Sequence, residues 1–247
     1  MKLASLSKRV LTAAGEAVFY STVSERSQLF GKTFVREGAG SRRLALTFDD
    51  GPNDPHTLRL LDVLAKHEVK ATFFMIGRFV DERPQIARAV AQAGHAIGNH
   101  TYTHPNLFLA SGPQHARELE EREKALADAV GEHAKLFRPP WGFRRPATLR
   151  AAARRGLATV MWSVSAKDWK LGTAEAIEQL AAAQITGGEV ILLHDGRHWQ
   201  MGVDCAVTIA AAERLIVRYS GEGYHFATVP EMMSDRQKRA AEASPTA

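Results

Sequence analysis

The strongest constraint on the fold is a regular alternation of short apolar runs with amphipathic stretches. Each apolar run has the length of a strand, and the stretch after it carries Ala, Leu, Glu and Arg at helical spacing. The runs are 44–48, 71–76, a stretch ending at His100, 136–137, 158–162 and 190–193; the helical stretches are 56–67, 84–93, 113–130, 146–155, 173–185 and 203–219. Strand followed by helix, repeated, predicts an α/β fold with a parallel sheet.

The number of repeated units bears on how the sheet closes. Six or seven units in a stretch of about 190 residues favour a closed or nearly closed barrel over an open doubly wound sheet. The pattern alone does not decide between the two.

The two ends of the chain differ from this central region. Over 3–19, apolar side chains recur at steps of three and four residues, which predicts an amphipathic helix. That helix either packs on the domain or lies, through its basic residues, on an anionic membrane surface. We therefore expect three parts: the helix and a connector at 1–42, the main domain at 43–233, and a polar, frayed tail at 234–247.

Composition excludes several kinds of protein and site. With 45% hydrophobic and 24% charged residues the chain is typical of globular proteins, and a net charge of +5 is small for nucleic-acid binding. Cys205 is the only cysteine, so any metal must be held by histidines and carboxylates. No apolar stretch reaches the length of a membrane span, and Glu16 interrupts what would be the apolar region of a signal peptide. We expect a cytoplasmic protein or one bound peripherally to the inner membrane.

Polar side chains that could do chemistry follow the predicted strands at their carboxyl ends. These residues are Asp49, Asp50, His100, His104, Arg138, Asp168 and His194. In a parallel α/β fold the carboxyl ends of the strands share one face, and ligands bind there. The sequence therefore predicts one polar site at that face.

Each motif has two interpretations when taken alone. Asp49 and Asp50 are adjacent carboxylates that point in different directions, so one could bind a metal while the other accepts a proton, yet Asp-Asp-Gly-Pro also suits a plain turn. His100 and His104 could grip one cation from one face of a helical turn or from a fixed loop, but His194 and a histidine four residues later have the same spacing.

The remaining motifs suggest an acid and an oxyanion donor. His194 ends the most apolar strand and could serve as a general acid if a carboxylate keeps it protonated, or could be an idle histidine in a hydrogen bond. Arg138 precedes two prolines, which have no N–H, so that Trp141 offers the next free backbone donor. Without the glutamate of an HExxH motif, the base must come from elsewhere, and Asp49 is the candidate.

Four of these motifs together resemble a known family. They are Thr-Phe-Asp49-Asp50-Gly-Pro, His100-Thr-x-x-His104, Arg138-x-Pro-Trp141 and Leu-Leu-His194-Asp, in that order. This set resembles the polysaccharide deacetylases of carbohydrate esterase family 4 (CE4), the nodulation-factor deacetylase homology domain, over about Arg43 to Met233. The resemblance implies a deformed (β/α) TIM-like barrel with about seven parallel strands, a divalent metal (zinc, or cobalt, nickel or manganese), and removal of N-acetyl groups from amino sugars.

The resemblance also implies a role for each matching residue. Asp50, His100 and His104 correspond to the metal ligands. Asp49 corresponds to the general base, and His194 to the acid that protonates the departing amine.

Three further residues are implied as supporting groups. Arg138 resembles the arginine that keeps the base ionised, Asp168 the carboxylate that orients the acid histidine, and the Trp141 N–H an oxyanion donor. The residues after Asp168-Trp169 depart from the family pattern, so the wall of the acetyl pocket differs. Trp199 lies either over the site as a sugar-stacking platform or packed on the barrel rim.

The leading hypothesis is a metal-dependent hydrolase that removes N-acetyl groups from N-acetylglucosamine-containing oligo- or polysaccharides. Its first rival is a deacetylase or deformylase of a lipid-linked sugar at the membrane surface, supported by the basic amphipathic segment at 3–19. The others are a catalytically silent carbohydrate-binding barrel and a cofactor-free amidase of small cyclic amides. We expect an N-acetylated sugar as partner, no nucleic acid, and peripheral membrane contact through the N-terminal helix; the oligomeric state stays open.

Overall fold

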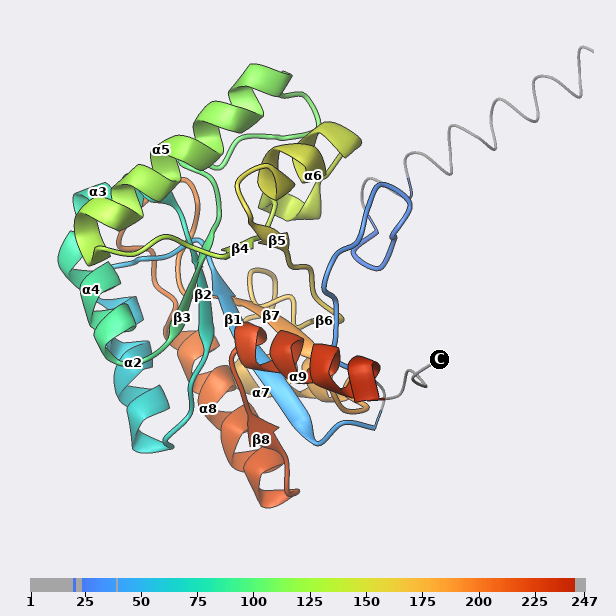
Figure 1. The fold of residues 1–247 in the computed structure, drawn as a ribbon. Helices are drawn as coiled ribbons and strands as arrows, with labels where there is room; N and C mark the ends of the chain where they lie inside the picture. Colours follow the sequence, from blue (N-terminus) through green and yellow to red (C-terminus); the bar gives the residue numbers. More distant parts are fainter. Residues whose placement is uncertain (1–19, 21–23, 39, 243–247) are drawn as a thin grey trace, which may run out of the picture.

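A computed structural model describes residues 20, 24–38 and 40–242 of the 247-residue chain. The helix predicted over 3–19 lies outside these residues, as do the last five residues of the predicted tail. What is described is a curled parallel sheet wrapped by helices (Figure 1).

Seven strands follow one another in a continuous path across the sheet. They are β1 (Arg43–Asp49), β2 (Thr72–Met75), β3 (Ala96–Asn99), β4 (Leu136–Phe137), β5 (Ala158–Thr159), β6 (Val164–Ser165) and β7 (Val190–His194). Their order is β5-β4-β3-β2-β1-β7-β6, every pairing along it is parallel, and β8 (His225–Phe226) pairs with β1 beside this path. The predicted deformed (β/α) barrel with about seven parallel strands is confirmed.

Strand β1 lies inside the sheet, between β2 and β7, and its sequence suits burial on both faces. It runs Arg-Leu-Ala-Leu-Thr-Phe-Asp and is buried from Leu44 onward. Continuous burial of this kind is typical of parallel strands with helices on both sides. Phe48 stacks on Phe73 of β2 with ring centroids 5.3 Å apart. Asp49 follows Phe48 as the last residue of β1 and therefore lies at the carboxyl end of the sheet.

The helices cover the sheet in the order that the sequence predicts. They are α2 (His56–Lys66), α3 (Gly77–Glu82), α4 (Pro84–Gln92), α5 (Gly112–Val130), α6 (Pro146–Ala153), α7 (Ala174–Ala182), α8 (Ala206–Gly221) and α9 (Val229–Glu242), with the short 3₁₀ turn η1 (Pro140–Gly142). Six of them match the predicted stretches with ends shifted by a few residues. The sequence pattern did not predict α3 and α9.

The prediction of a frayed tail from Ser234 is wrong, because helix α9 continues to Glu242. Its start is capped reciprocally: the Thr228 N–H donates to Glu231 at 2.7 Å, and the Glu231 N–H donates to Thr228 Oγ1 at 3.4 Å. Asp235 then pairs with Arg43 of β1, over which α9 lies in Figure 1. The cap and the ion pair explain why a polar sequence is helical here.

The predicted connector also contributes to the barrel. The Phe34 N–H donates to Thr159 O at 2.9 Å, and its carbonyl accepts from the Met161 N–H at 2.7 Å. Two residues later Arg36 bridges antiparallel to Glu189, just before β7. Residues 34–36 therefore bridge both the end of β5 and the start of β7, two strands that do not pair with each other. Within the part of the chain that the structure describes, no helix has the length and apolar character needed to cross a membrane.

Phe34→Ala tests whether this bridging segment is part of the core. Phe34 is 7% exposed and packs with Val160 and Met232. We expect the variant to lower the free energy of unfolding by about 3 kcal/mol, because a buried aromatic ring is replaced by a cavity. Urea unfolding measures this change. Leu29→Ala, at a side chain 66% exposed, is the control and should shift stability by less than about 0.5 kcal/mol. A Phe34→Ala effect as small as that of the control would show that Phe34 is not part of the core.

Candidate active site

The predicted site residues meet around one cavity of about 320 Å³. Six of them line it: Asp49, Asp50, His100, His104, Trp141 and His194. Arg138 and Asp168 are buried behind the lining, each against one of the six. All eight follow or end a strand, so the parallel sheet brings together residues up to 145 positions apart in the chain.

The Asp49 carboxylate is held by a fully buried arginine. Arg138 Nη1 donates to Asp49 Oδ1 at 2.7 Å and to Thr47 Oγ1 at 2.8 Å, and Nη2 donates to Met161 O at 3.0 Å. The guanidinium lies over the ring of Phe74 at 4.1 Å. Burial lowers the pKa of Arg138 and Asp49 opposes that change, but a guanidinium stays charged at any physiological pH. Asp49 therefore has one oxygen fixed on a permanent cation.

Asp50, His100 and His104 form a buried cluster suited to a divalent cation. One ligand atom from each lies within 4.8 Å of the other two. Asp50 Oδ1 is buried without a hydrogen-bond partner, 3.5 Å from His100 Nε2 and 3.3 Å from His104 Nε2. A buried carboxylate oxygen without a partner is costly, and a cation between it and the two imidazoles would satisfy it.

The protonation of the cluster also fits a metal. His100 Nδ1 lies 2.8 Å from Arg138 O and donates its proton there, so Nε2 is the ring nitrogen that faces the cluster. Burial and the neighbouring His100 lower the pKa of His104 to about 2, which keeps its ring neutral. Burial opposes ionisation of Asp50, but the surrounding histidines outweigh it and hold the pKa of Asp50 well below its ordinary value. Two imidazoles and one carboxylate are a ligand set that zinc and related divalent ions prefer.

The histidine pair sits on a loop, not on a helical turn. Thr101 and His104 have positive φ values of 66° and 60°, which turn the chain back toward Asp50. Glu118 of α5 holds the loop in this shape, since its Oε2 accepts from the N–H groups of Tyr102 at 2.9 Å and Thr103 at 2.8 Å. The sequence motifs did not identify Glu118, because it lies inside an ordinary helical stretch.

His194 and Asp168 form the second charged pair. Asp168 Oδ1 lies 3.0 Å from His194 Nδ1, and Oδ2 accepts from the His194 N–H at 2.9 Å and from Thr208 Oγ1 at 3.0 Å. Burial lowers the pKa of His194, but Asp168, together with Asp50 and Asp49, outweighs burial and raises the pKa to about 9. Likewise, burial opposes ionisation of Asp168, and His194 lowers its pKa. At neutral pH His194 is therefore a cation with Nδ1 fixed and Nε2 free.

The Asp49–Arg138 pair and the His194–Asp168 pair lie next to each other, because Asp49 and His194 are the last residues of two neighbouring strands. Asp49 of β1 is the register partner of His194 of β7. Adjacent strands lie about 4.8 Å apart, and residues in register on parallel strands point to the same face. A carboxylate and an imidazolium are thereby placed next to each other at the floor of one cavity.

Aromatic side chains form much of the cavity wall. All four tryptophans of the chain line it: Trp141, Trp162, Trp169 and Trp199. Trp199 is 60% exposed, so it is not packed into the barrel rim. Trp141 adopts a positive φ of 51°, and its ring meets His104 edge-on at 4.3 Å. The role of the Trp141 N–H as an oxyanion donor stays a prediction.

His198 is a cavity residue whose place the sequence did not predict. Its ring stacks on His104 with centroids 4.3 Å apart, and its backbone N–H donates to Asp50 Oδ2 at 3.2 Å. The spacing of the second histidine pair was visible in the sequence, but nothing there placed His198 against Asp50.

Comparison with known proteins identifies relatives along most of the chain. The family model for polysaccharide deacetylase matches residues 36–160. A chitooligosaccharide deacetylase of Sinorhizobium fredii is 37% identical over 206 residues, which cover 81% of this chain and 96% of that protein. A peptidoglycan-N-acetylglucosamine deacetylase of Bacillus cereus is 36% identical over 198 residues, which cover 79% and 70%.

A solved structure shares the fold but not the activity of these relatives. It is a CE4 family pseudoenzyme from Bacillus anthracis, with a TM-score of 0.74 and 27% sequence identity, covering 81% of this chain and 68% of that one. Since this fold hosts a pseudoenzyme, activity must be judged from the site residues themselves.

Asp168→Asn tests the electrostatic origin of the His194 cation. Removing the carboxylate leaves burial as the main influence, so we expect the pKa of His194 to fall from about 9 toward or below its ordinary value. Because the protonated form is lost as pH rises through the pKa, His194 would become neutral at a lower pH. Ring resonances followed by NMR against pH measure this. His133→Gln, at an exposed histidine, helps assign the spectrum and should leave His194 unchanged; a His194 pKa unaffected by Asp168→Asn would contradict the account.

Proposed function

We propose that this chain, which belongs to the polysaccharide deacetylase family and is a hydrolase of amide bonds, removes N-acetyl groups from N-acetylglucosamine units of an oligo- or polysaccharide. The observation that carries the proposal is the pairing of Asp49 with His194 in register beside the Asp50, His100 and His104 cluster. A base, an acid and a cation site share one cavity there.

The cluster would hold a divalent metal through Asp50, His100 and His104. Zinc suits a site with three nitrogen and oxygen ligands and an open position, and cobalt, nickel or manganese could replace it. When bound, the ion supplies a Lewis acid that polarises the acetyl carbonyl.

Asp49 would act as the general base. One of its oxygens is fixed on Arg138, and the other, Oδ2, lies 3.8 Å from His100 Nε2 on the cluster side of the carboxylate. Oδ2 would accept a proton from the water that attacks the acetyl carbon. Arg138, 2.7 Å away, compensates the charge of the buried Asp49 carboxylate.

His194 would complete the reaction as general acid. Its pKa of about 9 keeps the ring protonated at neutral pH, and Asp168 fixes Nδ1 so that Nε2 is free to donate. As the C–N bond breaks, the amine nitrogen takes the proton from His194, and the acetyl carbon leaves as acetate with the oxygen of the attacking water. The Trp141 N–H would donate to the oxyanion formed on the way.

The exposed tryptophans favour a sugar as the substrate. Trp141, Trp169 and Trp199 are 45%, 42% and 60% exposed around the cavity. Flat aromatic faces next to polar groups suit the amphipathic face of a sugar ring. A catalytically silent carbohydrate-binding barrel would need the tryptophans but not the two charged pairs, so the complete set favours the enzyme.

Two substitutions separate metal binding from catalysis. We expect Asp49→Asn to retain the metal and to lower acetate release from an N-acetylglucosamine oligomer at least about 100-fold, because the amide cannot accept the proton. His100→Ala should lose both the metal and the activity. Metal content is measured by mass spectrometry and acetate by an enzymatic assay.

His133→Ala is the matched control, since this histidine is exposed and lies outside the cavity. It should keep metal and activity. A metal-free His100→Ala protein that still releases acetate, or a fully active Asp49→Asn protein, would contradict the proposed roles.

A further inference from the structure

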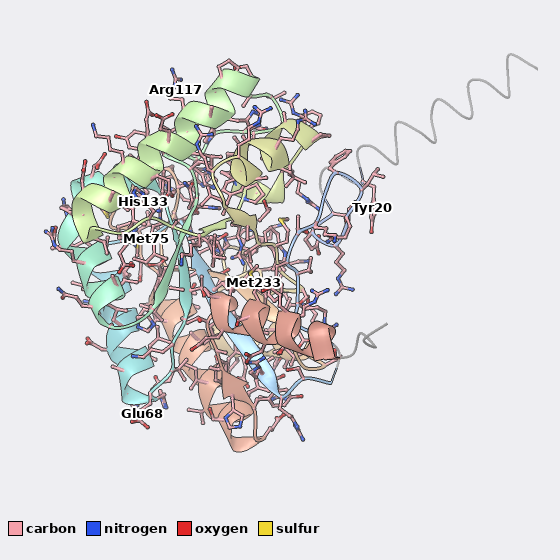
Figure 2. All side chains as sticks on the ribbon, in the orientation of Figure 1. Tyr20, Glu68, Met75, Arg117, His133 and Met233 are labelled. Atoms are coloured by element: carbon pink, nitrogen blue, oxygen red, sulfur yellow. The ribbon has the colours of Figure 1, made fainter. Side chains whose placement is uncertain are left out.

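A second large concavity lies away from the catalytic cavity. It measures about 790 Å³ and lies between the N-terminal segment 26–36, strand β5 and helix α9. No residue lines both this groove and the catalytic cavity. Figure 2 labels Met233 on the α9 side of the groove and Tyr20 at the start of the described N-terminal segment. A ligand could therefore occupy the groove without blocking the catalytic cavity.

The groove is basic. Arg26, Lys32, Arg36 and Arg236 line it, and no acidic side chain does. Arg36 pairs with the buried Glu189 at 2.9 Å, which leaves three cations. Arg26 and Arg236 donate only to the backbone carbonyls of Ser163 and Arg36, and neither these two nor Lys32 has a carboxylate partner within the described part of the chain.

Apolar side chains accompany these cations. Phe34 and Met233 line the groove between them. Leu29 of the segment 26–36 is 66% exposed, and Tyr20, which precedes that segment in the chain, is 61% exposed. Exposed apolar residues flanked by lysine and arginine are typical of surfaces that lie in the headgroup region of a membrane.

Charge and apolar contact distinguish among the ligands that could occupy this groove. Residues 1–19 contain Lys2, Lys8 and Arg9 against Glu16 alone, so their sequence has the same charge sign as the groove. A nucleic acid would gain little, because the Phe34 ring is 7% exposed and offers no stacking face. An anionic lipid matches both the cations and the apolar floor, and the basic segment 1–19 would add to its attraction.

We propose that this groove binds the anionic headgroups of a phospholipid membrane. The protein would then bind peripherally through this surface while the catalytic cavity stays open to its substrate. The inference does not depend on the reaction that the cavity catalyses.

Vesicle sedimentation of the full chain tests this surface. The vesicles contain either phosphatidylcholine alone or phosphatidylcholine with phosphatidylglycerol, and the groove variant combines Arg26→Gln, Lys32→Gln and Arg236→Gln. We expect binding to the anionic vesicles only, weakened by added salt, and reduced about tenfold or more in the groove variant. A control variant, Arg117→Gln, Lys124→Gln and Lys135→Gln, removes the same charge from exposed positions outside the groove and should bind as the wild type does.

Far-ultraviolet circular dichroism and a thermal melt establish that both triple variants are folded. Absence of binding by the wild type, or equal binding by the groove variant and the wild type, would overturn the proposal. Equal loss in both triple variants would also overturn it, because net charge and not the groove would then govern binding. A chain lacking residues 2–19 should keep salt-sensitive binding; complete loss in that chain would assign the interaction to the N-terminal segment instead.

Discussion

The buried ion pair between Arg138 and Asp49 is the contact on which the rest of the site depends. One guanidinium, entirely removed from solvent, donates to Asp49 and Thr47 of β1 and to the carbonyl of Met161 beyond β5. The carbonyl of the same arginine accepts from His100 beyond β3. Buried ion pairs often add little to stability, because desolvation offsets the attraction. This one connects strand ends in the geometry that catalysis needs.

A division of labour between two carboxylates follows from their partners. Asp49 faces a permanent cation, whereas Asp168 faces a histidine whose proton it stabilises. Asp49 is therefore able to accept a proton, whereas His194, held by Asp168, is able to donate one. The two residues differ in this way although they lie side by side at the ends of β1 and β7. The fold alone does not guarantee activity, since a CE4 family pseudoenzyme shares the architecture.

Sequence periodicity predicted the long buried strands and most helices. An apolar run such as that of β1 is stable only in a sheet that is covered on both faces, so its place in the fold could be predicted. It missed β6 and β8, which are two residues long, and the bridging role of residues 34–36. The eight candidate site residues were visible because they follow strands or form motifs. Glu118 and His198 were not, since their roles arise from tertiary contacts with no local pattern.

The most direct test of the account is the release of acetate by wild-type protein purified without added metal or chelator, measured together with its metal content. We expect close to one divalent ion per chain, acetate release from a short N-acetylglucosamine oligomer, and loss of that release on chelation with recovery when metal is restored. A protein without metal that still released acetate, or one with its metal in place that released none, would contradict the central claim that Asp49 and His194 act beside a metal held by Asp50, His100 and His104.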